Sequence, residues 1–182
     1  MKNNGKNTMQ MAQIAMIAAI YATLTLVLAP ISFSVVQFRI SELLTVLPLF
    51  TPLAVPGLTL GCFLANLLGA LLGMNPTGYL DSIVGTCATL LAALCTYWIG
   101  QKFSRPGVRF ALAPLPPVIF NMIIVGVELT LLFNQGASFV PAFLANAISV
   151  AVGEAVVCYV LGVPFMMVLS KNQFYRKIFR CS

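Results

Sequence analysis

Histidine is absent from this 182-residue sequence, and charged residues make up only 8% of it. Without histidine, neither a Ser-His-Asp triad nor a histidine-ligated zinc site can form. The five cysteines include no Cys-x-x-Cys pair, and no phosphate-binding loop of the GxxxxGK type occurs. These absences argue against an autonomous soluble enzyme, and we expect no catalytic residues and no bound metal or cofactor.

Apolar residues dominate what is present. They make up 60% of the sequence, against roughly 45–50% in an ordinary soluble domain. Because a helix that spans a bilayer needs about 20 largely apolar residues, we expect an all-α integral membrane protein. Residues 1–182 should form one compact bundle of about six transmembrane helices. The expected spans cover about residues 9–29, 41–55, 57–73, 81–100, 111–133 and 141–169.

The first two spans need separate comment. Two lysines precede the first apolar run, as in a signal peptide, but the run exceeds the ~7–15 apolar residues of such a peptide. We therefore expect it to be retained as a helix. The span at 41–55 is short and contains Pro48 and Pro52, which predicts a kinked or broken helix.

Basic residues are concentrated on one side of the predicted bundle. With six spans, only Arg39 among the 10 lysines and arginines falls on the side opposite the termini. Because lysine and arginine remain cytoplasmic, we expect both termini, the loop at 101–109 and a basic tail at 171–182 to lie inside a bacterial cell. The net charge of +6 is then explained by topology and by contact with anionic lipid, without a nucleic-acid partner. The residues on the cytoplasmic side are Lys2, Lys6, Lys102, Arg105, Arg109, Lys171, Arg176, Lys177 and Arg180.

Polar and ionisable residues inside the spans are the candidates for a binding site, because such residues are costly in a membrane and usually face a partner, a cavity or a pathway. At ~1.5 Å per helical residue, Glu128 and Asn146 lie level, ~8 Å below the outer ends of their helices. Asn121 and Glu154 lie level near the midplane. The pattern predicts a polar pocket that opens outward, roofed by Asp81 and the segment 39–42. The candidate substrate-binding residues are Arg39, Glu42, Asp81, Asn121, Glu128, Asn146 and Glu154.

Simpler interpretations exist for most of these residues. Ser41 could cap the second helix, with Glu42 favoured by the positive end of the helix dipole. Asp81 could equally be a helix N-cap. The asparagines Asn66, Asn121 and Asn146 could only form hydrogen bonds between helices. Glu128 and Glu154 have no lysine or arginine in the same spans to neutralise them, so for these two the functional interpretation is favoured.

Two stripes of small residues allow close helix approach. The third span carries Gly57, Gly61, Ala65, Gly69 and Gly73 at four-residue spacing, and we expect this ladder to pack inside the bundle. The first span carries Ala12, Ala15, Ala19 and Ala22, a face that could pack internally or meet another protein. The four cysteines within apolar segments are expected to act as small packing residues.

The chain resembles the queuosine-precursor transporter (QueT) family, the substrate-binding S components of energy-coupling factor (ECF) transporters. The resemblance rests on "VQFRISELLTVLP" (36–48), "GLTLGC" (57–62), "LDSIVGTCATL" (80–90), "PPVIFNMIIVGVEL" (116–129) and "VGEAVVCYVLGVPF" (152–165). In addition, "AMIAA" (15–19) is similar to the AxxxA motif that S components present to their membrane partner, which assigns Ala15 and Ala19 to partner binding.

The resemblance implies a six-helix fold that binds a 7-deazaguanine precursor of queuosine near the outer face. It also implies three partners, namely a transmembrane coupling protein and two cytoplasmic ATPases, so that ATP is hydrolysed outside this chain. A carboxylate such as Glu154 or Glu128 suits the adjacent N–H donors on one edge of a guanine-like ring. Arg39 and Glu42 would then pair as a latch over the pocket.

Three alternatives to this function remain. The chain could be an S component for another vitamin, with the same fold and a different pocket. It could be a proton-coupled carrier that uses Glu128 and Glu154, although no inverted repeat is visible. It could be a scaffold in which the acidic residues only form hydrogen bonds.

Overall fold

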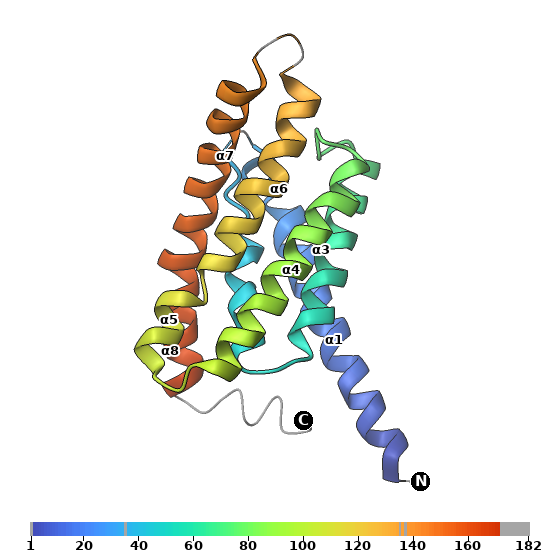
Figure 1. Ribbon diagram of the computed structural model, residues 1–182. Helices are drawn as coiled ribbons and strands as arrows, with labels where there is room; N and C mark the ends of the chain where they lie inside the picture. Colours follow the sequence, from blue (N-terminus) through green and yellow to red (C-terminus); the bar gives the residue numbers. More distant parts are fainter. Residues whose placement is uncertain (1, 35, 135, 137, 172–182) are drawn as a thin grey trace.

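The computed structural model describes residues 2–34, 36–134, 136 and 138–171, and the regular structure of these residues is entirely helical (Figure 1). The predicted basic tail lies outside the described residues, except for Lys171. The elements in chain order are α1 (Lys2–Val27), α2 (Ala29–Ser32), the 3₁₀ helix η1 (Ile40–Leu49), α3 (Ala54–Leu71), α4 (Leu80–Lys102), α5 (Pro106–Leu112), α6 (Leu115–Phe133), α7 (Phe139–Ala155), the π-helical segment η2 (Val156–Gly162) and α8 (Val163–Lys171).

Five helical stretches are long and apolar enough to cross a membrane, which confirms the predicted class of all-α membrane bundle. Large apolar side chains on these helices point outward, and Ile83, Leu131 and Val160 are each more than 60% exposed. The four acidic side chains, Arg39 and many uncharged polar side chains are instead buried between the helices. This inside-out distribution is the one expected where lipid is the solvent. The five stretches are Gly5–Val27, Ala54–Leu71, Leu80–Lys102, Pro106–Phe133 and Phe139–Lys171.

The predicted span at 41–55 differs from the expectation, because it is not an α-helix of spanning length. It is the ten-residue 3₁₀ helix η1, which at about 2.0 Å per residue covers ~20 Å. The non-helical residues 36–39 precede it and at ~3.3 Å per residue add ~13 Å. Together they match the hydrocarbon thickness of about 30 Å, so the chain still passes through the bundle six times.

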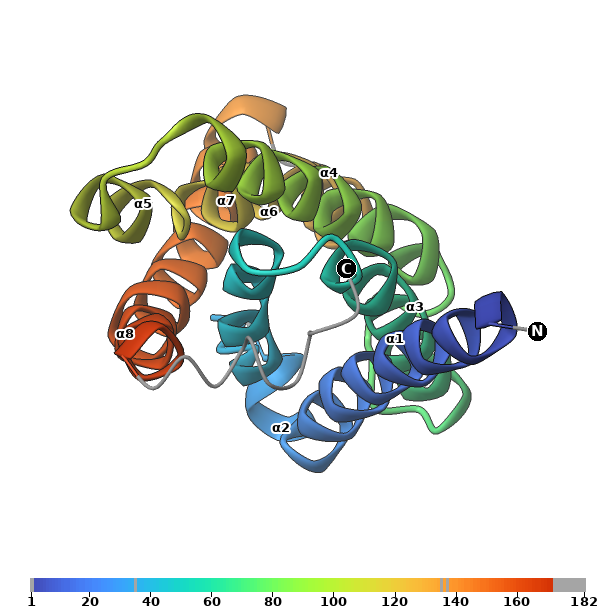
Figure 2. The same ribbon diagram turned by 90° about the horizontal axis from the view of Figure 1, so that it is seen from below.

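This irregular crossing segment, residues 36–49, is enclosed by other helices. The segment η1 contacts α1, α3, α4, η2 and α8, and Figure 2 shows it lying inside the ring that these helices form. No residue from 36 to 39 or within η1 is exposed. Non-helical backbone at membrane depth is tolerated only where protein rather than lipid surrounds it, and the bundle provides that enclosure.

The small-residue ladder of α3 packs against α1, as predicted. A Cβ atom added to Gly61 would lie 2.8 Å from the Cβ of Tyr21 and 3.0 Å from the carbonyl oxygen of Ala18. A Cβ added to Gly57 would lie 2.9 Å from the side chain of Ile17. Gly73 departs from the pattern, because it follows the helix with a φ of +68° and has open space around it.

The two ends of the bundle differ in charge. The N-terminus, the α4–α5 connection and α8 lie at one end, and the α6–α7 loop and the α3–α4 turn lie at the other (Figure 1). At the first end, Arg109 donates hydrogen bonds to the carbonyls of Phe103 and Gly100. The Lys102 ammonium lies 4.4 Å from the centre of the Trp98 ring. Placement of these basic residues at the N-terminal end agrees with the predicted topology.

Candidate functional site

The four acidic residues of the chain all lie inside the bundle. Glu42, Asp81, Glu128 and Glu154 are each no more than 3% exposed. Arg39 is the basic residue that the sequence predicts on the side of the bundle opposite the termini. It is buried with the acidic residues, at 2% exposure. The structure therefore brings together side chains from η1, α4, α6 and α7 that are far apart in the sequence.

The guanidinium of Arg39 forms a salt bridge with Asp81, with 3.4 Å between Nη2 and Oδ2. The side-chain amide of Asn75 donates to the same carboxylate oxygen at 2.9 Å. The amide of Asn66 donates to the Asp81 carbonyl at 2.9 Å. Gly85 makes room for this arrangement, because a Cβ atom there would overlap the Asp81 carboxylate and lie 2.9 Å from the Asn66 amide nitrogen.

The predicted latch between Arg39 and Glu42 is therefore wrong, and so is the capping interpretation of Asp81. The N-cap of α4 is Tyr79, and it makes no side-chain capping bond. Arg39 is not a surface lid, since it is buried and lies 5.7 Å from the centre of the Phe33 ring. The Arg39–Asp81 pair instead ties the non-helical crossing segment to the start of α4.

Glu42 bonds to the first helix. The Tyr21 hydroxyl donates to its Oε1, while its Oε2 is buried without a hydrogen-bond partner among the described residues. Ser41 lies beside it and shares a 2.6 Å hydrogen bond with the hydroxyl of Thr25. Ser41 is therefore not a helix cap, and the N-cap of η1 is Arg39.

Glu154 and Asn121 meet near the middle of the bundle. The Asn121 amide donates to Glu154 Oε1 at 3.0 Å, which confirms that these two residues lie level. The Cys158 thiol lies 3.7 Å from Glu154 Oε2 and 3.8 Å from the Glu42 carbonyl. A Cβ atom on Gly153 would overlap the backbone of Gln37, so this glycine lets the crossing segment approach α7 next to Glu154.

Glu128 differs from the other three acidic residues. Neither of its carboxylate oxygens has a hydrogen-bond partner among the described residues, although both are buried. It interacts electrostatically with Asp81 and Arg39, which places it on the same interior face. Asn146 bonds across the α6–α7 interface two residues further along α6, where its amide donates to the Thr130 hydroxyl at 3.0 Å.

A cavity of about 320 Å³ lies between the crossing segment, the C-terminal end of α6 and the N-terminal half of α7. Phe33 and Phe133 offer aromatic surface to it, and the amides of Gln37, Asn134 and Asn146 offer hydrogen-bonding groups. The cavity therefore combines the apolar faces and neutral polar edges that suit a flat heterocyclic ligand.

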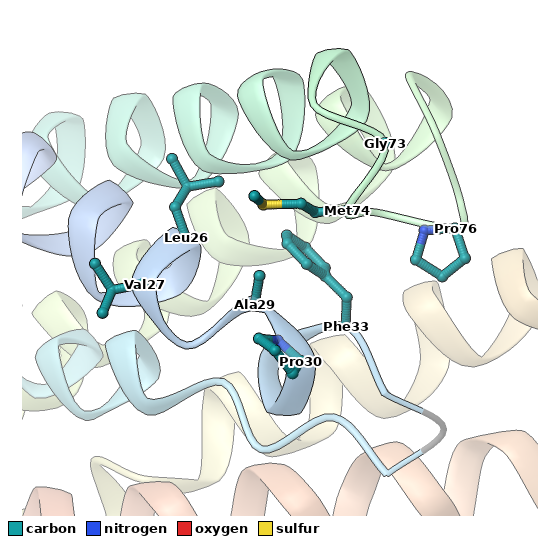
Figure 3. A pocket seen from close by; sticks show the side chains of 8 residues that line it. All are labelled: Leu26, Val27, Ala29, Pro30, Phe33, Gly73, Met74 and Pro76. Carbon is teal, nitrogen blue, oxygen red and sulfur yellow. The ribbon is translucent and has the colours of Figure 1, made fainter.

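A second, apolar groove of about 550 Å³ lies on the other side of Phe33. In Figure 3 the Phe33 ring points from the end of α2 toward Met74, and Pro76 lies to the right of both, on the α3–α4 turn. Phe33 and Pro76 line both spaces. These two residues therefore lie where the groove and the cavity adjoin.

Several residues of the site were not anticipated from the sequence. Tyr21 and Thr25 are one turn apart on α1 and supply hydroxyls, a spacing that could have signalled a polar face. Cys62 is not simply a packing residue, because Thr89 donates to its sulfur at 3.2 Å and Asn66 at 3.5 Å. Within the part of the chain that the structure describes, no group of three His, Cys, Asp or Glu side chains could hold a metal ion.

The fold and the site define a multi-pass membrane protein that encloses its four acidic residues and Arg39 in its helix bundle, an arrangement typical of proteins that pass ions or substrates across a membrane. The chain belongs to the QueT transporter family, whose model matches residues 11–171. It is 34% identical over 86 residues to the queuosine precursor transporter QueT of Lactococcus lactis subsp. cremoris (strain MG1363). That match covers 46% of this chain and 47% of the relative, so it spans about half the length of each. No solved structure matches the chain.

Proposed function

We propose that the protein is the substrate-binding membrane subunit of an importer for queuosine precursors of the 7-deazaguanine type. The observation that carries the proposal is the family match over residues 11–171 combined with four buried carboxyl groups facing one interior. A relative with 34% identity over part of the chain is named a queuosine precursor transporter. We propose that ligand enters from the outer side and leaves toward the cytoplasm.

The chemistry of a deazaguanine suits the enclosed acidic residues. One edge of its ring presents adjacent N–H donors, and a carboxylate accepts two such bonds at once. Glu154, held in place by Asn121, is the residue we assign to this edge. A buried acceptor of this kind discriminates strongly against analogues that lack the donors, because it is then left without a partner.

We further propose that ATP-hydrolysing partners drive the import. The sequence has no phosphate-binding loop of its own, so the hydrolysis would take place in two cytoplasmic ATPases joined through a transmembrane coupling protein. Ala15 and Ala19 are exposed on α1, and this small-residue face suits close approach of a partner helix. Ala19→Leu should abolish copurification of the partners and leave ligand binding by the isolated chain intact.

Calorimetric titration of the purified protein tests the substrate assignment. Deazaguanines should bind tightly, whereas riboflavin and thiamine, which lack the paired N–H donors, should bind weakly or not at all. Tight binding of a vitamin without binding of any deazaguanine would show an S component with a different pocket.

A proton-coupled carrier is the second candidate, favoured by the Glu128 carboxyl group, which has no hydrogen-bond partner among the described residues and could exchange a proton during transport. Uptake in cells that lack the ATPase partners decides between the two. Uptake that persists there and collapses with a protonophore would support the carrier.

A further inference from the structure

We propose that Glu128 is the counter-ion for a positively charged ligand, so that the site selects an amine-bearing deazaguanine over a neutral one. This inference rests on the proposed function and names the residue that makes binding depend on the charge of the substrate.

The balance of buried charge motivates the proposal. Among the described residues, four buried carboxyl groups face one buried guanidinium, and the salt bridge of Arg39 joins it to Asp81. The other three carboxyl groups share the charge of this one guanidinium at longer range and form no salt bridge among the described residues. A buried ion without a counter-charge is unfavourable, so the site is electrostatically complementary to a cation.

The hydrogen bonds single out Glu128 among these three. Tyr21 donates to Glu42, and Asn121 donates to Glu154. Both oxygens of Glu128 are buried, and neither has a hydrogen-bond partner among the described residues. A protonated carboxyl group at this position would be equally short of an acceptor within that part of the chain. An ammonium group from a ligand would satisfy both oxygens at once.

Glu128 does not itself line the cavity, but it is adjacent on α6 to a residue that does. The next residue, Leu129, lines the cavity of about 320 Å³, and so does Asn146, which bonds to Thr130 across the helix interface. The cavity itself offers amides and aromatic rings from the described residues. It can therefore hold a flat ring, while the charge of a side arm would be met by Glu128. Because the carboxylate oxygens are covered in this conformation, the groups that cover them must move for the ligand to reach them.

Two ligands that differ in charge test the inference. 7-Aminomethyl-7-deazaguanine is a cation at neutral pH, since an alkyl ammonium titrates near pH 10, whereas 7-cyano-7-deazaguanine is neutral. Calorimetric titration of the wild-type protein should show at least about tenfold tighter binding of the aminomethyl compound. Glu128→Gln should weaken its binding at least about 30-fold, the lower end of the effect of removing one partner of a buried charge pair. Binding of the cyano compound should change by less than about threefold.

The controls separate the possible failures. Glu128→Asp keeps the charge and should retain the preference for the amine, and Glu154→Gln should weaken both ligands alike because it removes a contact to the ring. Equal loss of both ligands in Glu128→Gln, or no loss of either, would overturn the role of Glu128 and leave the transport function standing. If the Gln variant does not fold, equal affinity of the wild-type protein for the two compounds would overturn it. Binding of neither compound by the wild-type protein would overturn the proposed function itself.

Discussion

The pairing of Arg39 with Asp81 illustrates how a single long-range contact fixes the role of a charged residue. Within "VQFRISE" the nearest acidic residue is Glu42, and the local pattern suggests that the two belong together. The structure joins Arg39 to a residue 42 positions away, at the start of α4. Sequence spacing indicates which residues can meet along one helix, but it carries no information about contacts between segments that pack only in the finished bundle.

At this scale we expect the buried pair to be sensitive to loss of either partner. Arg39→Met should lower the free energy of unfolding by about 3–5 kcal/mol, because it leaves Asp81 buried without its counter-charge. Combined with Asp81→Asn, it should cost less than the sum of the two single losses, because the remaining amide no longer needs the guanidinium. Thermal or chemical unfolding in detergent measures this.

The comparison with Glu42 is the control for this experiment. The cycle of Arg39→Met with Glu42→Gln should give a smaller coupling energy, since these two side chains form no salt bridge in the structure. Full additivity of the Arg39 and Asp81 substitutions, together with strong coupling to Glu42, would favour the local pairing that the sequence suggests.

The sequence predicted which residues form the site better than it predicted the hydrogen bonds and ion pairs between them. The rule that ionisable residues in a membrane gather away from lipid correctly placed Glu128 and Glu154 in the interior. Glu42 and Asp81 were expected to roof the pocket, and the structure buries them as well. The rule did not predict Tyr21, because a lone tyrosine in an apolar run also suits the membrane interface. Its hydroxyl gains a partner only when η1 packs beside α1.

Among the elements, the α1–α3 interface shows where glycine is required. The ladder predicted close packing, and the structure places Gly61 against Tyr21 and Ala18. The crossing segment was the element that sequence reasoning described least well. Pro48 and Pro52 indicated a broken helix, but the enclosed non-helical path depends on Gly153 admitting the backbone of Gln37, a contact between distant parts of the chain.

A matched pair of glycine substitutions tests the interface. Gly61→Ala should destabilise the protein, because the overlap with Tyr21 and Ala18 costs about 1–3 kcal/mol and exceeds the gain of at most about 1 kcal/mol in helix propensity. Gly107→Ala in α5 has nothing within 4 Å of the added Cβ, so it should be neutral or stabilising. Thermal unfolding of both variants in detergent checks this, and a stable Gly61→Ala protein would mean that α1 shifts easily on α3.

Across the whole molecule, the charge asymmetry sets the expected orientation. The structure gathers Lys102, Arg109 and Lys171 at the end that also carries the N-terminus. We expect this end to face the cytoplasm, because lysine and arginine are retained there. The cavity beside Asn146 would then open toward the outer side.

Single cysteines in a cysteine-free background test this orientation. Ser104 and Ser138 are both exposed and lie at opposite ends of the bundle. A membrane-impermeant thiol reagent applied to intact cells should label the cysteine at Ser138 and spare the one at Ser104, and both should react after the cells are permeabilised. The reverse pattern on intact cells would show that the protein faces the other way.

The irregular crossing at 36–49 constrains how the chain enters the membrane during synthesis. It contains fewer residues than a spanning helix, and it carries Arg39 and Glu42. Transfer of these two side chains into lipid at the bilayer centre costs several kcal/mol in total. The insertion machinery should therefore not accept it as an independent segment. We expect it to enter only once α3 and α4 are available to cover it, so glycosylation mapping of chains truncated before α3 should find residues 36–49 still outside the bilayer. Biogenesis of this protein would then proceed by the burial of an irregular, charge-bearing segment among helices that are already in the membrane.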